Sequence, residues 1–353
     1  MEKERRNHIL GFAVFVLLML VTGIVLFKGQ NLGEIKAALL QASPIYLVLA
    51  FLMAVLFQVA EAVKIYMTIN TMPVKVSFAK CLGYALIGFY FSSITPSSTG
   101  GQPAQIYYMK RDKINISYSS LTLLVLGFVH LATTLLFCGG LFALKFDFIS
   151  EKIKGVEFLF AFGIVVNVII LALVFVAIFS KKAAFSVVNG CIKILAKIKI
   201  LKNPEKSKSA AAEQIKEYSA SATYLRQNPM LLARVFVVNF AQITVMFLVT
   251  YFIYKAFGLS EYSALEIVVL QAVTTVSVAS LPLPGSVGAS ESVFMIIFKT
   301  LFGSALILPA MLFSRGISFY LILIISAAAT IFIHFKGMNF HKKLAKNLSE
   351  KIS

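Results

Sequence analysis

Residues 95–103 read TPSSTGGQP and interrupt an apolar segment with two prolines and two glycines. A second interruption, LPLPGSVGASE at residues 281–291, occupies the matching place in the other half of the chain. Inside a membrane, irregular backbone is tolerated only where protein or a water-filled cavity satisfies its polar groups. Paired interruptions of this kind therefore indicate a binding site like those of transporters.

The rest of the chain has the composition of a membrane protein. Of its 353 residues, 59% are hydrophobic and 14% are charged, and the mean hydropathy of +0.87 is too high for a soluble domain of this length. We predict an all-α, polytopic integral membrane protein, and we expect its first apolar run to be a retained span rather than a cleaved signal. Runs that approach or exceed the length of a membrane span occupy residues 9–27, 45–59, 156–179, 230–254 and 305–332.

The distribution of the net charge of +18 indicates the topology of the chain. Because the basic residues lie in loops between apolar runs rather than on one folded face, we expect no nucleic-acid partner. The positive-inside rule places these loops and both termini in the cytoplasm. Residues 81–109 lie between two such loops and must enter and return through the same face, whereas residues 264–302 do so from the opposite face. We therefore predict two opposed re-entrant helical hairpins.

The two halves of the chain have matching elements at nearly equal spacing. Because the first half starts outside and the second starts inside, we predict an inverted repeat within a single transmembrane domain of residues 1–353. The alternative is that proline and glycine merely kink ordinary spanning helices. We also expect an interfacial helix at residues 31–42 on the outer surface. The predicted parts are repeat one at 44–144, a basic amphipathic cytoplasmic linker at 181–228, and repeat two at 230–335.

Residue types that carry catalysis or bind metals are sparse. The four histidines lack metal-ligand spacing, and the three cysteines form no Cys-x-x-Cys pair. The sequence has no nucleophile elbow and no Walker-type phosphate loop. We therefore expect no catalytic residue, no metal and no cofactor, and we expect transport to draw on a gradient, a potential or downhill movement of the substrate.

The two interruptions supply most of the candidate substrate-binding residues. Their hydroxyl and amide groups can hydrogen-bond a lipid headgroup, their glycines let backbone N–H groups approach it, and the helix N-termini that follow favour phosphate. The candidates are Pro96, Ser97, Ser98, Thr99, Gly100, Gly101, Gln102, Gln105, Pro284, Gly285, Ser286, Gly288, Ser290, Glu291 and Arg315.

Several charged candidates have two interpretations. Glu291 is a costly intramembrane carboxylate, with either a functional task or the role of a helix cap. Arg315 either binds phosphate or pairs with Glu291. Glu61 and Lys64 form an ion pair at the inner surface or contact the headgroup. His130 is either a polar group satisfied between helices or a proton relay.

Residues 95–108 and 282–291 resemble the two signature segments of the lysylphosphatidylglycerol synthase transmembrane region, the flippase-like domain of the multiple peptide resistance factor. The resemblance extends over residues 9–335. It implies a multi-pass protein of the bacterial plasma membrane that moves a phospholipid such as lysylphosphatidylglycerol to the outer leaflet and protects against cationic antimicrobial peptides. Gln102 and Gln105 stand where many relatives carry an acidic residue and an arginine, which bears on the headgroup preference.

The sequence favours a stand-alone phospholipid flippase or scramblase. In the full resistance factor a synthase domain follows the membrane region, and we expect this chain to lack it and therefore to catalyse no aminoacyl transfer. Two alternatives stay open: an integral-membrane lipid transferase that uses Glu291 as acid or base, like a phosphatidylglycerol lysyltransferase, and a membrane anchor for a partner synthase. The expected partners are a membrane phospholipid and a separate lipid-modifying synthase, with homo-oligomers left open.

Overall fold

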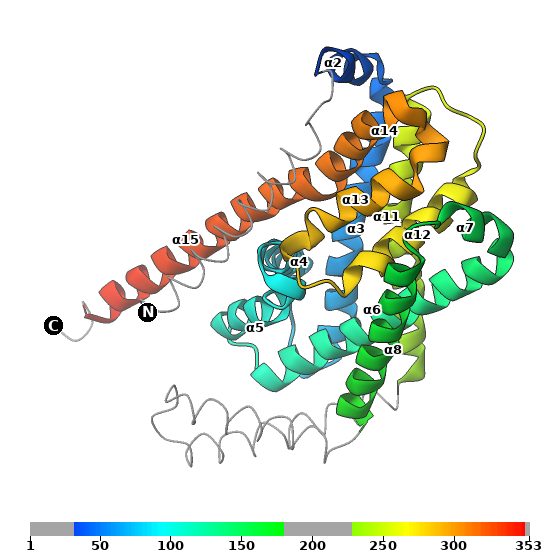
Figure 1. The fold of residues 1–353 in the computed structure, drawn as a ribbon. Helices are drawn as coiled ribbons and strands as arrows, with labels where there is room; N and C mark the ends of the chain where they lie inside the picture. The colour runs from blue at the N-terminus through cyan, green and yellow to red at the C-terminus, as the bar shows by residue number, and fades with distance from the viewer. Residues whose placement is uncertain (1–31, 180–227, 350–353) are drawn as a thin grey trace.

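The computed structural model describes residues 32–179 and 228–349. Within these ranges all regular secondary structure is helical, and five helices are long and apolar enough to cross a membrane (Figure 1). This confirms the prediction of an all-helical, multi-pass membrane protein. The five are α3 (Pro44–Ile69), α6 (Ile116–Leu144), α8 (Glu157–Phe179), α11 (Pro229–Ala256), and a continuous run of α14 (Lys299–Arg315), the π-helix η3 (Gly316–Leu321) and α15 (Ile322–Ser349).

Both interruptions seen in the sequence are turns between shorter helices. The first joins α4 (Phe78–Ile94) to α5 (Gly101–Arg111) through the 3₁₀ turn η1 (Pro96–Ser98). The second joins α12 (Ala264–Ala279) to α13 (Ala289–Ile297) through η2 (Pro284–Ser286). Each turn begins with a proline, whose fixed φ suits the position, and the two helices of each pair pack against each other. The chain therefore contains two helical hairpins.

The hairpins start from opposite ends of the bundle. The Ser43 N–H donates to the Ala256 carbonyl at 2.8 Å, which places the start of α3 beside the end of α11 and close to the start of α12. The other end of α3 lies about 39 Å away, given its 26 residues. There Asp112 accepts a hydrogen bond from Tyr84 and pairs with Lys80 at 3.3 Å, which holds both arms of the first hairpin together.

The turns of the two hairpins meet inside the bundle. The 3₁₀ turn η1 packs against η2, and η2 also packs against α4. We call residues 95–100 the first tip and residues 280–288 the second tip. Positive φ angles reverse the chain at both tips, at Ser97 (49°) and Ser98 (55°) in the first and at Gly285 (57°) and Ser286 (52°) in the second.

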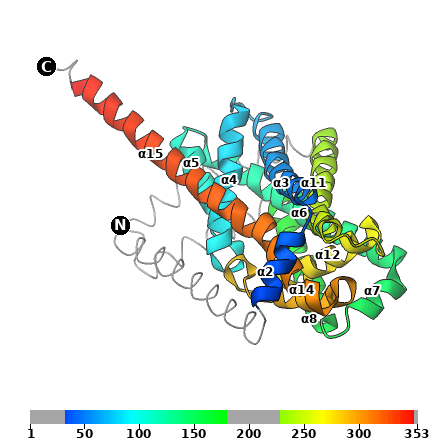
Figure 2. The same ribbon diagram turned by 90° about the horizontal axis from the view of Figure 1, so that it is seen from above.

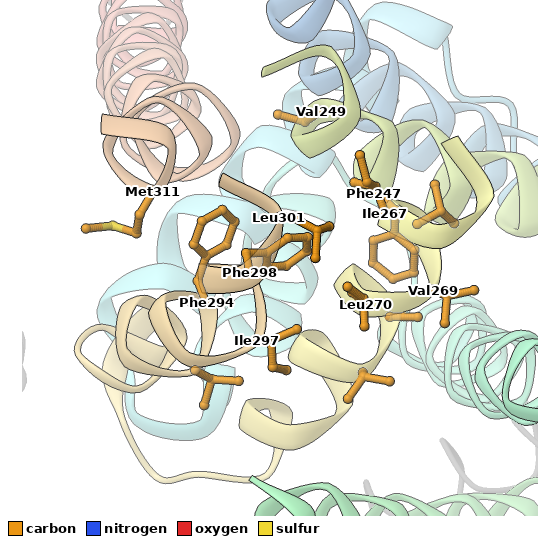
Figure 3. Close-up of a cluster of buried hydrophobic side chains, with 14 of the residues drawn as sticks. Phe247, Val249, Ile267, Val269, Leu270, Phe294, Ile297, Phe298, Leu301 and Met311 are labelled. Carbon is orange, nitrogen blue, oxygen red and sulfur yellow. The ribbon is translucent and has the colours of Figure 1, made fainter. Parts of the chain in front are cut away.

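A core rich in phenylalanine fixes the second hairpin against the long helices. Phe294 and Phe298 stack with their ring centroids 4.5 Å apart, and Phe302 packs beside both. Figure 3 shows Phe294 and Phe298 between Met311 on one side and the labelled α11 and α12 side chains on the other. Because lipid is as apolar as this core, close packing rather than removal from water holds such helices together.

The other elements surround this centre. Helices α3 and α11 lie side by side and form the largest helix contact (Figure 2), and α15 extends away from the bundle. The short helix α7 (Phe146–Lys152) follows α6, and α2 (Leu32–Gln41) packs on α14 where an interfacial helix was expected. The predicted span at 9–27 and the predicted linker, except for residue 228, lie outside the described residues.

Candidate functional site

A cavity of about 650 Å³ lies between the two tips and helices α3, α4, α5 and α6; we call it the first cavity. Its lining combines hydroxyl, amide and charged side chains, an unusual set for the interior of an apolar bundle. Many of the candidates chosen from the sequence contribute to it: Ser97, Ser98, Thr99, Gln102, Gln105, Gly285, Ser286, Glu61, Lys64 and His130.

An ion pair lies on the α3 side of the first cavity. The Lys64 Nζ atom lies 2.8 Å from Oε2 of Glu61 and donates to Oδ1 of Asn239 at 2.7 Å. Gln242 donates to the same Glu61 oxygen at 3.0 Å. The Lys64 side chain is only 1% exposed, against 26% for Glu61. Glu61 and Lys64 thus form the ion pair that one interpretation of the sequence expected, and both side chains bond to α11.

His130 extends this network to α6. Its Nδ1 atom lies 3.3 Å from Oδ1 of Asn239. Because that oxygen already accepts from Lys64, it is an acceptor for His130 as well, and Nδ1 is the nitrogen that carries the proton. His130 is thus a polar group bonded between helices, and its ring also lines the first cavity.

Two amide groups of the network have unused donors. Within the described residues, Nε2 of Gln58 and Nδ2 of Asn239 are buried and have no hydrogen-bond partner. Gln58 lines the first cavity one helical turn before Glu61. A buried amide donor without a partner costs about 1–3 kcal/mol. Gln58 thus lines the first cavity and carries an amide donor that no described protein group uses.

Glu291 holds the second tip together. Its Oε2 atom accepts from the Gly288 N–H at 2.7 Å, while Oε1 accepts from Nε of Arg315 at 2.8 Å and from the Tyr320 hydroxyl at 3.2 Å. The residue is 2% exposed and lines neither the first cavity nor a second cavity beyond the tips. Glu291 thus has the helix-cap role that one interpretation of the sequence gave it, and it also pairs with Arg315.

Arg315 connects the second tip to the π-helix. Its Nη2 atom donates to the Gly285 carbonyl at 3.0 Å, and its guanidinium carbon lies 4.2 Å from the centre of the Phe319 ring. A Cβ atom at Gly285 would overlap the Phe319 ring, and its φ of +57° also favours glycine. The π-helix therefore begins at the residues that contact the second tip. Short π-helical segments within α-helices are frequent at functional sites.

The second cavity, of about 260 Å³, lies on the other side of the tips, among α11, α12 and α14. It is lined by Arg315 and by Ser290, Thr250, Gln271 and other polar residues. The two cavities share five lining residues and are therefore adjacent; we call these residues the dividing wall. They are Phe57, His130, Met246, Gly285 and Ser286.

The remaining candidates support the tips without lining either cavity. Gly101 packs so closely on α4 that a Cβ atom would overlap Ser92 and lie 2.8 Å from the Gly88 carbonyl oxygen. The Gly100 N–H donates to Thr95 at 2.8 Å. Gly288 has a φ of +86°. Pro96 and Pro284 begin the 3₁₀ turns.

Sequence reasoning missed several residues of the site. Gln58, Asn239 and Gln242 are amides in apolar helices, spaced three residues from each other or from Glu61, and this spacing could have identified them. Tyr320, Phe57 and Met246 gave no such signal, because aromatic residues and methionine are ordinary in membrane helices. Their roles depend on contacts that only the fold shows.

One comparison with known proteins identifies the family. The family model described as the lysylphosphatidylglycerol synthase TM region matches residues 8–326, which include both hairpins and both cavities. No curated protein matches the chain. The match confirms the resemblance that the two interruptions carried, and it associates the chain with a lipid-related membrane function. The chain belongs to the lysylphosphatidylglycerol synthase transmembrane-region family.

Proposed function

We propose that this protein is a flippase or scramblase that moves phospholipids between the leaflets of the plasma membrane. The observation that carries the proposal is the meeting of two hairpin tips beside a polar cavity inside an apolar bundle. Broken helices that meet within a bundle form the substrate sites of secondary transporters. Membership of a lipid-related membrane family supports a lipid as the substrate.

In this proposal both hairpins are re-entrant. The arms of the first hairpin, α4 and α5, have 17 and 11 residues, and those of the second, α12 and α13, have 16 and 9. Even the longest arm extends only about 26 Å, whereas the hydrocarbon core of a membrane is about 30 Å thick. Each hairpin would then enter and leave through one face, and residues 44–144 and 230–335 would form an inverted repeat. The basic loops at both ends of the first hairpin would face the cytoplasm, together with the two termini.

The two cavities give the headgroup a path. The polar headgroup would occupy the first cavity while the acyl chains remain in the surrounding lipid. Displacement of the Phe57 and Met246 side chains in the dividing wall would open the way to the second cavity, where Thr250, Gln271 and Ser290 provide new hydrogen bonds. In each step, polar contacts in one cavity are exchanged for polar contacts in the other. This exchange lowers the free-energy cost of moving a headgroup through the hydrocarbon core.

A pair of glycine substitutions on α6 tests the proposal. Gly127 lines the first cavity, whereas a Cβ atom added at Gly140 on the same helix would meet no atom within 4 Å. We expect purified wild-type protein in liposomes to expose acyl-labelled phospholipid of the inner leaflet to dithionite. Gly127→Leu should slow this exposure about ten-fold because the new side chain fills the cavity, whereas Gly140→Leu should leave it unchanged. Absence of lipid movement in the wild type, or equal rates in the two variants, would contradict the proposal.

The same liposomes test the transferase alternative. Mass spectrometry of their lipids should show no new product, since both carboxylate oxygens of Glu291 are engaged by groups of the protein and neither is free to act as acid or base. A headgroup-modified lipid that appears only with protein present would instead support a transferase.

A further inference from the structure

We infer that the first cavity selects phospholipids whose headgroup carries one phosphate and one ammonium group, and that Glu61 and Lys64 set this selectivity. The inference rests on the proposed function and names its substrate class. A headgroup with these two charges is zwitterionic and has no net charge. Lysylphosphatidylglycerol, with two ammonium groups and one phosphate, carries one net positive charge, and phosphatidylglycerol carries one net negative charge.

The charges of the site are already balanced. Among the described residues that line the first cavity, Glu61, Lys64 and His130 are the titratable ones apart from groups ionised only at the extremes of pH. Glu61 and Lys64 pair at 2.8 Å and cancel each other. Beyond the dividing wall, Glu291 cancels Arg315 in the same way, also at 2.8 Å. A headgroup with a net charge would therefore enter without a counter-charge, in surroundings where solvation by water is weak.

The phosphate end of a headgroup has donors on two helices that line the cavity. On α3, Lys64 provides an ammonium group, and Gln58, which is 4% exposed, has an amide donor without a partner within the described residues. The second helix is α5, which has 11 residues and no acidic residue in its first turn, and whose Gln102 also lines the cavity. Helix N-termini favour phosphate. The corresponding position on α13 is already occupied by the Glu291 carboxylate.

The ammonium end of the headgroup has one acceptor of opposite charge. The carboxylate of Glu61 lies one helical turn from Lys64 and is the more exposed of the pair, at 26%. The charged atoms of Glu61 and Lys64 lie 2.8 Å apart, so a headgroup whose phosphate and ammonium groups are joined by a short link can contact both side chains at once. A zwitterion can thus lie antiparallel to the ion pair and leave the cavity neutral. A second ammonium group would find no second carboxylate among the described lining residues.

Three acyl-labelled lipids in parallel liposomes test this inference. We expect wild-type protein to move phosphatidylethanolamine about ten-fold faster than either phosphatidylglycerol or lysylphosphatidylglycerol, a factor that corresponds to about 1.4 kcal/mol. Glu61→Gln leaves one positive charge in the cavity and should shift the preference toward phosphatidylglycerol. Lys64→Gln leaves one negative charge and should shift it toward lysylphosphatidylglycerol. The double variant Glu61→Lys with Lys64→Glu keeps the cavity neutral and should retain the preference for phosphatidylethanolamine.

The outcomes separate this inference from the proposed function. If the wild type moves all three lipids equally, or moves the lysylated lipid fastest, the selectivity is contradicted while lipid movement stands. If no lipid moves, the proposed function itself fails. Should the variants not fold, thermal stabilisation of the wild type by each lipid in detergent gives the same ranking without a substitution, and equal stabilisation by all three lipids would also contradict the inference.

Discussion

At the scale of single residues, Lys64 is the charged group of the site with the least contact with solvent. It is 1% exposed, and Glu61 and Asn239 are its polar partners. Removal of one partner of a buried ion pair leaves the other charge uncompensated, whereas replacement of both can be nearly neutral. The stability of the α3–α11 contact should therefore depend on the pair as a unit.

Lys64→Met is expected to lower the free energy of unfolding by about 3 kcal/mol, because Glu61 would keep its charge without its cation. The double variant Glu61→Gln with Lys64→Met should recover most of this loss. Thermal unfolding of the purified variants measures both effects, with Lys36→Met as control because Lys36 is exposed on α2. Additive losses in the double variant would contradict the expectation.

Glu291 gives a second prediction at this scale. Glu291→Gln removes the charge that pairs with Arg315 and weakens the bond to the Gly288 N–H, so the second tip loses its support. We expect a lower unfolding temperature together with strongly slowed lipid movement. The matched change Glu261→Gln, at an exposed position before α12, should alter neither. Slowed movement with unchanged stability would instead mean that Glu291 contacts the lipid directly.

The sequence predicted individual residues of the site unequally. Residues of the two interruptions could be chosen because glycine, proline and hydroxyl side chains are unusual within apolar runs, and several of them line the first cavity. Two interpretations of each charged residue stayed open, because the sequence does not show which groups from distant segments lie beside it. Asn239 lies 175 residues from Lys64, and Arg315 lies 24 residues from Glu291.

At the scale of elements, the first hairpin depends on close contact between its two arms. Gly101→Ala would bring a Cβ atom against Ser92 and the Gly88 carbonyl oxygen. Overpacking of this kind costs about 1–3 kcal/mol. We expect a lower unfolding temperature and slower lipid movement from the displaced first tip. Gly139→Ala, on α6 where no atom is within 4 Å, should be neutral or slightly stabilising. A neutral Gly101→Ala would show that the arms can separate freely.

The elements themselves were largely predictable. Proline and glycine marked both tips, and the apolar runs marked the long helices, because these signals act locally. The break between α13 and α14 illustrates the limit. The last apolar run in the sequence begins at residue 305, and Gly303 just before it does have a non-helical φ of +70°, but a further helical turn begins at Lys299. The π-helix after Arg315 had no local signal, since it follows from the contacts of Arg315 and Phe319 with the second tip.

At the scale of the whole molecule, the two ends of the bundle should face different compartments. Lys113 follows the first hairpin at one end, and Ser260 precedes the second hairpin at the other. Both are exposed. In a variant with the native cysteines replaced by alanine, a membrane-impermeant maleimide added to intact cells should label Ser260→Cys and not Lys113→Cys. Labelling of both from the same side would contradict the re-entrant arrangement.

The relation between the halves was the least predictable part of the fold from local pattern alone. Matched spacing and loop charges suggested opposed hairpins, but spacing cannot show whether their tips touch. In the structure the tips do touch, and Phe294, Phe298 and Phe302 belong to a core that joins the second hairpin to α11 and α14. Contacts of this kind depend on how the shapes of side chains from different helices fit together, and a local sequence pattern carries no information about that fit.

The dividing wall has an electrical consequence. A continuous aqueous pore through a lipid transporter would let ions leak and dissipate the voltage across the membrane. Phe57 and Met246 contribute apolar side chains to the lining of both cavities, and narrow apolar constrictions block ion flow by excluding water. Planar-bilayer recordings should therefore show no steady current through the wild type, while Phe57→Ala combined with Met246→Ala should produce one. The same two side chains would let a cell move lipids between leaflets without losing its membrane potential.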